Sequence, residues 1–267
     1  MSFDTGGTRE ASAVLQFVRP NLGCYVTERL QRRVPNCVSL SPIFYPRNAQ
    51  GGRGAIGFQY FLFEPPSSGR IKRAMITDAP PTKKNRHFFT ESDKLDTLRV
   101  PPDDRLRRIA SAIEAAMKSG RAKEVLLVSR EFLDTAADFY QVKHCDVRVL
   151  TARPLRVRER SAIELFGDYN PNTILIRVWM KTAIRKEITS FGTFLSTLCH
   201  EFCHHLDFQR FPDSWHTRGF YERTASLYHH ARGTPQKRLI WIPIRSRRWR
   251  IDWQRTNRVA QHAHSSN

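Results

Sequence analysis

Two histidines four residues apart, with a glutamate directly after the first, are the residues of this chain best suited to chemistry. They occur in the segment His200-Glu201-Phe202-Cys203-His204. On a helix, residues i and i+4 lie one turn apart on the same face, so both imidazoles can bind one metal ion. Zinc (Zn²⁺) binds imidazole nitrogen, and a catalytic zinc site keeps one position open for water. Glu201 would then lie beside that water and take its proton as the water attacks a carbonyl carbon.

A catalytic zinc ion usually has three protein ligands, so a third must come from elsewhere in the chain. We predict that it is His216, which follows the turn at Pro212 near the start of the next helix. Glu222, within that helix, is the alternative. Cys199 and Cys203 are soft ligands on the same helix as the histidine pair. Cys203 projects between the packed face and the histidine face, so we expect it in the core.

A single helix over about residues 188–210 would position the histidine pair. Apolar side chains recur there at i, i+3, i+4 and i+7 spacing, namely Phe191, Phe194, Leu195, Leu198, Phe202 and Leu206. With about 100° per residue, His200 and His204 fall roughly opposite this stripe. One face of the helix is therefore expected to pack and the other to line a cleft. Because proline cannot continue a helix, Pro212 predicts where it ends.

Other segments predict a mixture of helices and strands. Pro101 and Pro102 open a helix that Gly120 closes, with apolar residues at helical spacing between them. A second helix is expected at about residues 131–141, and strands at 58–63, 147–151 and 173–180. This alternation predicts an α+β fold.

Composition divides the chain into three regions. Residues 1–98 contain repeated glycine and proline breakers and are expected to be a poorly defined, partly disordered N-terminal region. Residues 99–236 are expected to form a single catalytic domain, and residues 237–267 a basic tail rich in tryptophan and arginine. Arginines of the tail could pair with phosphates, while Trp249 and Trp253 could stack on exposed bases of a nucleic acid. The alternative is a basic, partly disordered end whose tryptophans cover the core.

The net charge is strongly positive. Lys and Arg number 44 against 25 Asp and Glu, which gives +19. This balance favours contact with polyanions such as nucleic acid, although a soluble protein from an arginine-rich proteome would share it. The five cysteines include no C-x-x-C pair, which argues against a zinc ribbon or a disulfide framework. Neither a signal-peptide pattern nor an apolar run of membrane-spanning length is present, so we expect a cytoplasmic protein without membrane contact.

Together, the histidine motif and the later His216-Thr217-Arg218-Gly219-Phe220 resemble the SprT-like (Spartan-related) zinc metallopeptidases. Members of that family carry His-Glu-x-x-His, often with Cys before the second His. A later His, usually followed by Gly and by an aromatic residue four positions on, supplies the third ligand. This chain has Phe220 at the aromatic position but Thr217 after the histidine, and it lacks the four-cysteine ribbon that many members carry.

The resemblance covers roughly residues 131–233 and implies a zincin-like fold. In that fold a small mixed or antiparallel sheet packs on an active-site helix and a following helix. By the resemblance, His200, His204 and His216 would bind zinc, and Glu201 would act as the general base in peptide-bond hydrolysis.

These observations predict a zinc metallopeptidase that acts on a protein or peptide substrate. If the strand at 173–180 runs along the cleft as an edge, an extended peptide could add to it by backbone hydrogen bonds. One alternative is a non-catalytic nucleic-acid-binding protein that uses the basic tail and has a structural or vestigial metal site. Another is a zinc hydrolase acting on a non-peptide amide.

Several residues near the motif are candidates for supporting roles. Asp207 could orient a metal ligand through its carboxylate, or could simply end the helix in solvent. His205 points away from the histidine pair and is expected at the surface. Transition-state stabilisation needs a hydrogen-bond donor near the oxyanion. The candidate donors are Tyr221, Arg223, Tyr228 and His229.

Overall fold

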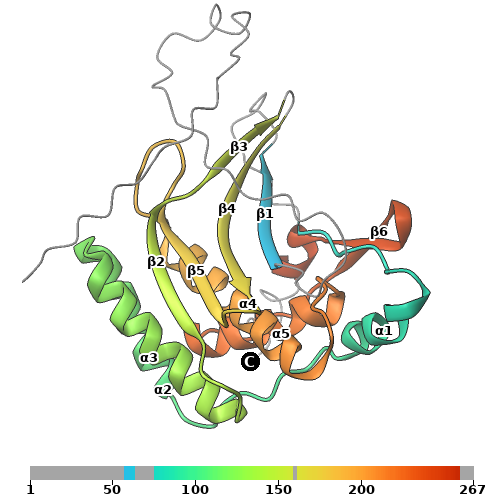
Figure 1. The fold of residues 1–267 in the computed structure, drawn as a ribbon, viewed down its shortest axis with the longest axis horizontal. Helices are drawn as coiled ribbons and strands as arrows, with labels where there is room; N and C mark the ends of the chain where they lie inside the picture. Colours follow the sequence, from blue (N-terminus) through green and yellow to red (C-terminus); the bar gives the residue numbers. More distant parts are fainter. Residues whose placement is uncertain (1–56, 64–74, 159–160, 259–267) are drawn as a thin grey trace, which may run out of the picture. The chain divides into compact units, whose positions relative to one another are not determined.

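The computed structural model describes residues 57–63, 75–158 and 161–258. The chain divides into two compact units, residues 1–50 and residues 51–267, and the first lies outside the described residues. Of the N-terminal region 1–98 that was expected to be partly disordered, residues 1–56 and 64–74 lie outside the described residues. The second unit has an α+β fold, as the sequence predicts (Figure 1).

Helices and strands alternate along the second unit. The main helices are α1 (Arg86–Lys94), α2 (Arg105–Ser119), α3 (Ala122–Tyr140), α4 (Phe191–Arg210) and α5 (Arg218–Arg232). The strands are β1 (Gly57–Phe63), β2 (Asp146–Ala152), β3 (Leu155–Arg158), β4 (Ser161–Asn170), β5 (Leu175–Lys181), β6 (Trp241–Ile244) and β7 (Arg248–Ile251). None of the helices in these described ranges is long and apolar enough to cross a membrane.

One mixed sheet has the strand order β1-β4-β5-β2, and β3 pairs with the first half of β4. Strands β1, β3 and β5 run antiparallel to β4, whereas β2 runs parallel to β5. Residues 173–180 were predicted as a strand, and β5 confirms it, but β5 is not the edge strand that peptide addition there would require, because it has β4 on one side and β2 on the other. Within the described part of the chain, β1 pairs with β4 alone and is an edge of the sheet.

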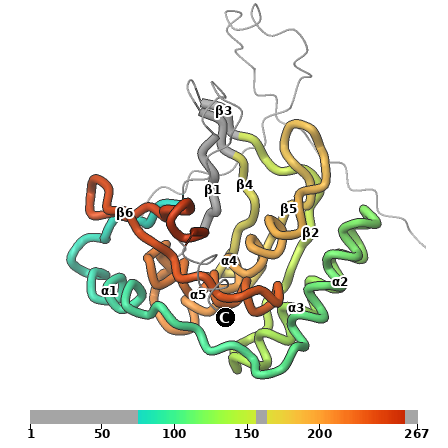
Figure 2. The backbone as a smooth tube through the Cα atoms, turned by 180° about the vertical axis from the view of Figure 1, so that it is seen from behind, coloured from blue at the N-terminus to red at the C-terminus, as the bar shows by residue number. Residues whose placement is uncertain are grey.

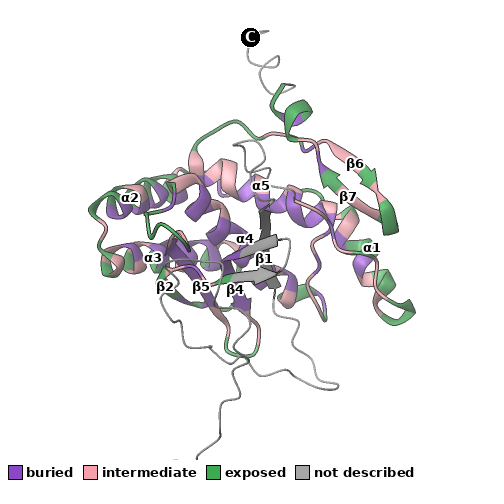
Figure 3. Ribbon diagram, turned by 90° about the horizontal axis from the view of Figure 1, so that it is seen from above, coloured by how far each residue is buried: buried purple, intermediate pink, exposed green. Residues whose placement is uncertain are grey.

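Helix α4 packs against β4 and β5, and α5 packs against α4. The α2–α3 pair covers β2 and also contacts α5. Figure 3 shows that α4 is buried along most of its length, whereas the outer faces of α2 and α3 are exposed. The largest fully buried side chains that hold these layers together include Phe132, Ile176, Phe194, Leu195, Leu198, Phe202 and Phe220. The central helix is thus held in place by packing on several sides.

Local sequence signals place the long helices well. Helix α2 ends at Gly120, whose φ of 72° is the left-handed conformation that glycine adopts without strain. Helix α3 begins at Ala122, earlier than expected, because the segment 122–130 continues the buried stripe through Val125. Strand β4 was not predicted, since Gly167 and Asp168 in its middle are residue types that strands usually avoid.

The compact unit that contains the expected catalytic domain extends beyond residues 99–236. Residues 75–98 and 237–258 belong to the same compact unit as residues 99–236. The tail forms an antiparallel hairpin of β6 and β7, and Leu239 and Ile251 join the core. Viewed from behind, α1 and this hairpin lie beside α5 (Figure 2). Both additions therefore contribute to the part of the fold that carries the histidines.

Candidate metal centre

Helix α4 ends at Arg210 as its sequence predicts, and it begins at Phe191 rather than at about residue 188. The Ser190 hydroxyl accepts a hydrogen bond from the backbone N–H of Thr193 at 3.3 Å, which caps the first turn. The last turn closes at Phe211, whose N–H donates to the carbonyl of Asp207, and Pro212 follows. Between these ends, His200 and His204 lie on one face of an uninterrupted helix, as the i, i+4 spacing requires.

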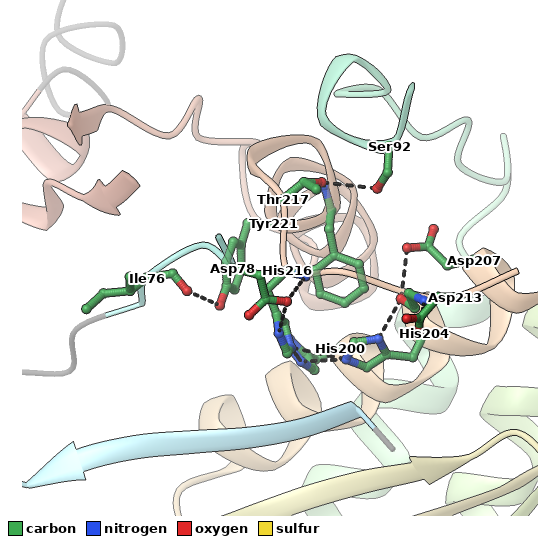
Figure 4. Close-up of polar contacts among 12 residues, drawn as sticks. Ile76, Asp78, Ser92, His200, His204, Asp207, Asp213, His216, Thr217 and Tyr221 are labelled. Atoms are coloured by element: carbon green, nitrogen blue, oxygen red, sulfur yellow. Dashed lines mark hydrogen bonds and ion pairs between the residues drawn. The ribbon is translucent and has the colours of Figure 1, made fainter. Parts of the chain in front are cut away.

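The structure brings the three predicted ligands together. The Nε2 atoms lie 3.0 Å apart for His200 and His216, 3.1 Å for His200 and His204, and 3.2 Å for His204 and His216 (Figure 4). His216 comes just before α5, whose first turn is capped by the Thr217 hydroxyl, which accepts from the N–H of Phe220 at 3.0 Å. Among the described residues, these three histidines are the group of side chains that could hold a metal ion.

Hydrogen bonds at Nδ1 define the tautomers of two of the rings. The His204 Nδ1 lies 2.7 Å from the Ser214 hydroxyl, which donates its one hydrogen to Asp207 at 2.9 Å. Ser214 must therefore accept from the Nδ1–H of His204. The His216 Nδ1 lies 3.3 Å from a carboxylate oxygen of Asp78, which can only accept. Both rings thus carry hydrogen on Nδ1 and present a lone pair at Nε2.

This donor set fits a cation. Lone pairs on nitrogens about 3 Å apart repel one another unless a positive charge lies between them. A tetrahedral zinc ion with bonds of about 2.0–2.1 Å would hold its ligand nitrogens about 3.3–3.4 Å apart, close to the spacing found. Burial lowers the pKa of His200 and His204 well below the ordinary value, and the neighbouring histidines lower it further. The rings of His200 and His204 are therefore neutral, which is the form that binds a metal.

Glu201 directly follows His200 on α4 and is buried, with both carboxylate oxygens unpaired among the described residues. Burial raises its pKa well above the ordinary value, and the charge of Asp168 raises it further. The side chain packs against Gly167 of β4, where a Cβ atom would come within 3.0 Å of the Glu201 Oε1. A buried carboxylate without a donor is costly, so this group is suited to accept from water held at the cluster.

The alternative third ligand does not join the cluster. Glu222 accepts hydrogen bonds from the backbone N–H of Leu239 at 3.2 Å and from the indole of Trp241 at 3.4 Å. Its carboxylate therefore holds the start of the C-terminal hairpin. Cys199 and Cys203 lie in the core, as expected for Cys203, and burial raises the pKa of the Cys203 thiol to about 12.

The sequence left two roles open for Asp207. The structure places its carboxylate where it can orient His204 through Ser214. It is buried and accepts from Ser214 on one oxygen and from Arg223 at 2.6 Å on the other. Burial raises the pKa of Asp207 to about 6, although the Arg223 guanidinium opposes this rise. A chain of hydrogen bonds therefore runs from Arg223 through Asp207 and Ser214 to the ring of His204.

The prediction that His205 lies at the surface is wrong. The ring is fully buried, and its Nε2–H donates to the backbone carbonyl of Lys143 at 2.7 Å. Its Nδ1 accepts from the Tyr169 hydroxyl at 2.9 Å. Because the sheet covers this side of α4, a histidine pointing away from the metal ligands meets protein rather than water.

Of the four proposed oxyanion donors, Tyr221 lies beside the cluster. Its ring stacks on His216 with centroids 5.8 Å apart, but its hydroxyl donates to the carbonyl of Ile76 at 3.3 Å. Arg223 is bound to Asp207, and His229 bonds the Thr234 hydroxyl at 2.8 Å. Tyr228 has its hydroxyl near Gly192, in the first turn of α4.

Sequence reasoning missed three residues of the site: Asp78, Ser214 and Gly167. Ser214 lies close to His216 in the chain and could have been suspected as a polar neighbour. Nothing in the sequence links Asp78 or Gly167 to the motif, since both reach it only through the fold.

Residues 237–258 of the basic tail belong to the described part of the chain, and residues 259–267 lie outside it. Trp249 is half-buried beneath the guanidinium of Arg218, with the charge centre 4.7 Å from the ring. Trp253 keeps 37% of its surface exposed. The exposed arginines of this region include Arg245, Arg247, Arg250, Arg255 and Arg258. Because the Trp249 ring already contacts Arg218, Trp253 is the more accessible of the two tryptophans for stacking on a base.

Comparisons of the chain with protein-family models, with curated proteins and with solved structures found no match. The geometry of the site is therefore the basis for assigning a function.

Proposed function

We propose that this chain is a zinc-dependent metallopeptidase with a zincin-like fold, similar to the SprT-like enzymes. The observation that carries the proposal is the convergence of the Nε2 atoms of His200, His204 and His216 at 3.0–3.2 Å. The buried, unpaired carboxylate of Glu201, which directly follows His200 on α4, would supply the second requirement of the reaction. Three imidazoles with an adjacent carboxylate match the ligand number and the base that a hydrolytic zinc site needs.

A zinc ion held by these nitrogens would lower the pKa of a water molecule and polarise the scissile carbonyl. Glu201 would accept the proton of the attacking water and later deliver it to the nitrogen of the leaving amine. Burial of Glu201 favours its protonated form, so the side chain can hold the proton between these two transfers. The Nδ1 hydrogen bonds of His204 and His216 keep their rings oriented during both transfers.

The edge of the sheet suggests how a substrate would bind. Strand β1 contacts α4, the helix that carries His200 and His204. A peptide in extended conformation would pair, through backbone hydrogen bonds, with the edge of β1 that carries no strand among the described residues. Such pairing recognises the main chain, so we expect protein or peptide substrates that are locally unfolded.

Zinc analysis combined with Glu201→Gln tests the proposal. We expect the purified full-length chain to contain zinc and to cleave an unfolded protein substrate. Glu201→Gln should keep the zinc and lose about 10²- to 10⁴-fold in rate, the usual contribution of a general base. Glu131→Gln, at an exposed position on α3, is the matched control and should retain full activity. Zinc binding together with unchanged cleavage by Glu201→Gln would show that the peptidase assignment is wrong.

A nucleic-acid-binding role for the basic tail stays a separate prediction. The exposed side chains of Arg245 and Arg247, at the turn of the β6–β7 hairpin, are the residues to change. A chain without zinc, whose salt-sensitive DNA or RNA binding is lost in Arg245→Glu/Arg247→Glu, would support the non-catalytic alternative. Cleavage of small amides but not of peptides would instead support the non-peptide hydrolase.

A further inference from the structure

A carboxylate from a distant part of the chain holds the third histidine. The backbone N–H of His216 donates to an oxygen of Asp78 at 2.8 Å, and the same oxygen lies 3.3 Å from the His216 Nδ1. In return, the N–H of Asp78 donates to the carbonyl of His216 at 2.9 Å. Three contacts thus join two residues that are 138 positions apart in sequence (Figure 4).

The segment that carries Asp78, residues 75–78, is itself anchored on the C-terminal hairpin. The N–H of Thr77 donates to the carbonyl of Trp249, and the N–H of Trp249 donates to the Thr77 hydroxyl, both at 2.8 Å. The carbonyl of Ile76 accepts from the Tyr221 hydroxyl at 3.3 Å. Residues 75–78 therefore form a strap between strand β7 and the third histidine.

We propose that Asp78 is a positioning residue of the metal centre and that the β6–β7 hairpin acts on the metal site through this strap. The inference rests on the proposed zinc site. Donation of Nδ1–H to Asp78 leaves the Nε2 lone pair of His216 directed at the other two histidines. A negative charge in contact with a ligand imidazole also strengthens that imidazole as a donor to a cation.

Among the described residues of the site, Asp78 is the one whose carboxylate directly contacts the ring of a predicted metal ligand. His204 is held through the neutral hydroxyl of Ser214, and the His200 Nδ1 is buried with no hydrogen-bond partner among the described residues. Three neutral imidazoles around a divalent cation leave its double charge uncompensated. The Asp78 carboxylate is the group in direct contact with a ligand that offsets part of this charge.

A structural role alone would give a different result from a positioning role. The Asp78 side chain keeps 46% of its surface exposed, so the contact of its carboxylate with His216 contributes little to folding. Loss of the carboxylate should therefore leave the stability of the metal-free protein nearly unchanged while weakening metal binding.

The test measures zinc affinity of the full-length chain by competition with a chromophoric chelator. Partners of ligand imidazoles typically contribute 10- to 100-fold in metal affinity, and the partial exposure of Asp78 places it near the lower end. We expect about a tenfold loss in Asp78→Ala, and a smaller loss in Asp78→Asn, whose amide oxygen still accepts the two hydrogen bonds. Asp96→Asn, an exposed position that removes the same charge, is the control and should bind zinc as the wild type does.

Two further readouts separate positioning from folding. The melting temperature of each metal-free variant should match that of the wild type, whereas the rise on adding zinc should be smaller in Asp78→Ala. Thr77→Val keeps the side-chain shape but removes the acceptor for the Trp249 N–H. It should weaken zinc binding severalfold and shift the visible spectrum of the cobalt-substituted protein, although Thr77 touches no ligand.

Each outcome has a distinct meaning. Wild-type zinc affinity in Asp78→Ala would overturn the positioning role and leave the zinc site standing. Unchanged zinc affinity in Thr77→Val would overturn the link to the hairpin. A wild-type chain that binds no zinc would overturn the metal centre itself and this inference with it.

Discussion

Gly167 of β4 permits Glu201 to occupy its place beside the metal ligands, and replacing this glycine should separate activity from metal binding. A Cβ at position 167 would lie 2.5 Å from the Cγ2 of Thr197 and 3.0 Å from the Cγ and Oε1 of Glu201. Both side chains project from α4, which packs directly on β4. The change Gly167→Ala must therefore move side chains of the active helix or the helix itself.

The structure gives the size of this movement. To reach an ordinary contact at 3.4 Å, the Thr197 methyl must move by about 0.9 Å, from 2.5 Å, and the Glu201 carboxylate by about 0.4 Å, from 3.0 Å. Overpacking of this kind costs about 1–3 kcal/mol of the free energy of unfolding. Displacement of a reacting group by up to about 1 Å can cost about 10²-fold in rate, so we expect kcat to fall by about 10- to 100-fold.

The assays are cleavage of an unfolded protein substrate, zinc affinity and thermal unfolding. Zinc affinity should remain at the wild-type value, because the added methyl meets Thr197 and Glu201 rather than the ligands. Thr197→Ser removes the methyl that makes the 2.5 Å contact and keeps the hydroxyl that bonds the Thr193 carbonyl. The double variant should regain most of the lost stability but little of the activity. Wild-type kcat and melting temperature in Gly167→Ala would refute the close packing of Glu201 on β4.

Three further predictions concern the supports of the site. Ser214→Ala removes the acceptor for the second histidine of the motif and should weaken zinc binding about tenfold, as measured by chelator competition. Arg223→Met leaves Asp207 buried without its cation and should cost about 3–5 kcal/mol of unfolding free energy at neutral pH. Urea titrations should show this loss shrinking as the pH falls toward about 6, since burial already raises the pKa of Asp207 to about 6 and the missing arginine raises it further, so the neutral acid forms in the variant at a higher pH than in the wild type. Gly219→Ala would place a Cβ 2.2 Å from the Ser92 carbonyl oxygen and should lower the melting temperature by several degrees, about 1–3 kcal/mol, whereas Gly192→Ala in α4, with its nearest contact at 3.3 Å, should be neutral or stabilising. Equal melting temperatures for the two alanine variants would contradict the close approach of α1 to α5.

Residues close in sequence were predicted well, because a helix relates them by a fixed rotation. The apolar stripe of α4 and the i, i+4 spacing place His200 and His204 on one face whatever the rest of the chain does. Proline at 212 and glycine at 120 end their helices for reasons contained in their own covalent structure. His216 could be anticipated because it is also close in sequence. The short turn after α4 returns the chain to that helix.

Contacts between distant segments were not predictable in this way. The sequence of β5 is apolar enough for an edge or an interior strand, and only its pairing with both β4 and β2 decides between them. His205 is buried because the sheet and the Lys143 carbonyl cover it, a fact that the helical rotation of α4 does not contain. Burial against another element is a property of the packing and not of the local pattern.

By itself, the amino-acid sequence determined which residues can bind a metal ion and accept a proton, since those properties belong to side chains at fixed helical spacing. The tertiary structure decided what surrounds them. It placed Gly167 where a side chain would displace Glu201, and it brought Asp78 from the N-terminal side to the ring of His216. These placements depend on pairing and packing between segments far apart in the chain, and such pairing depends on the whole set of contacts rather than on any one segment.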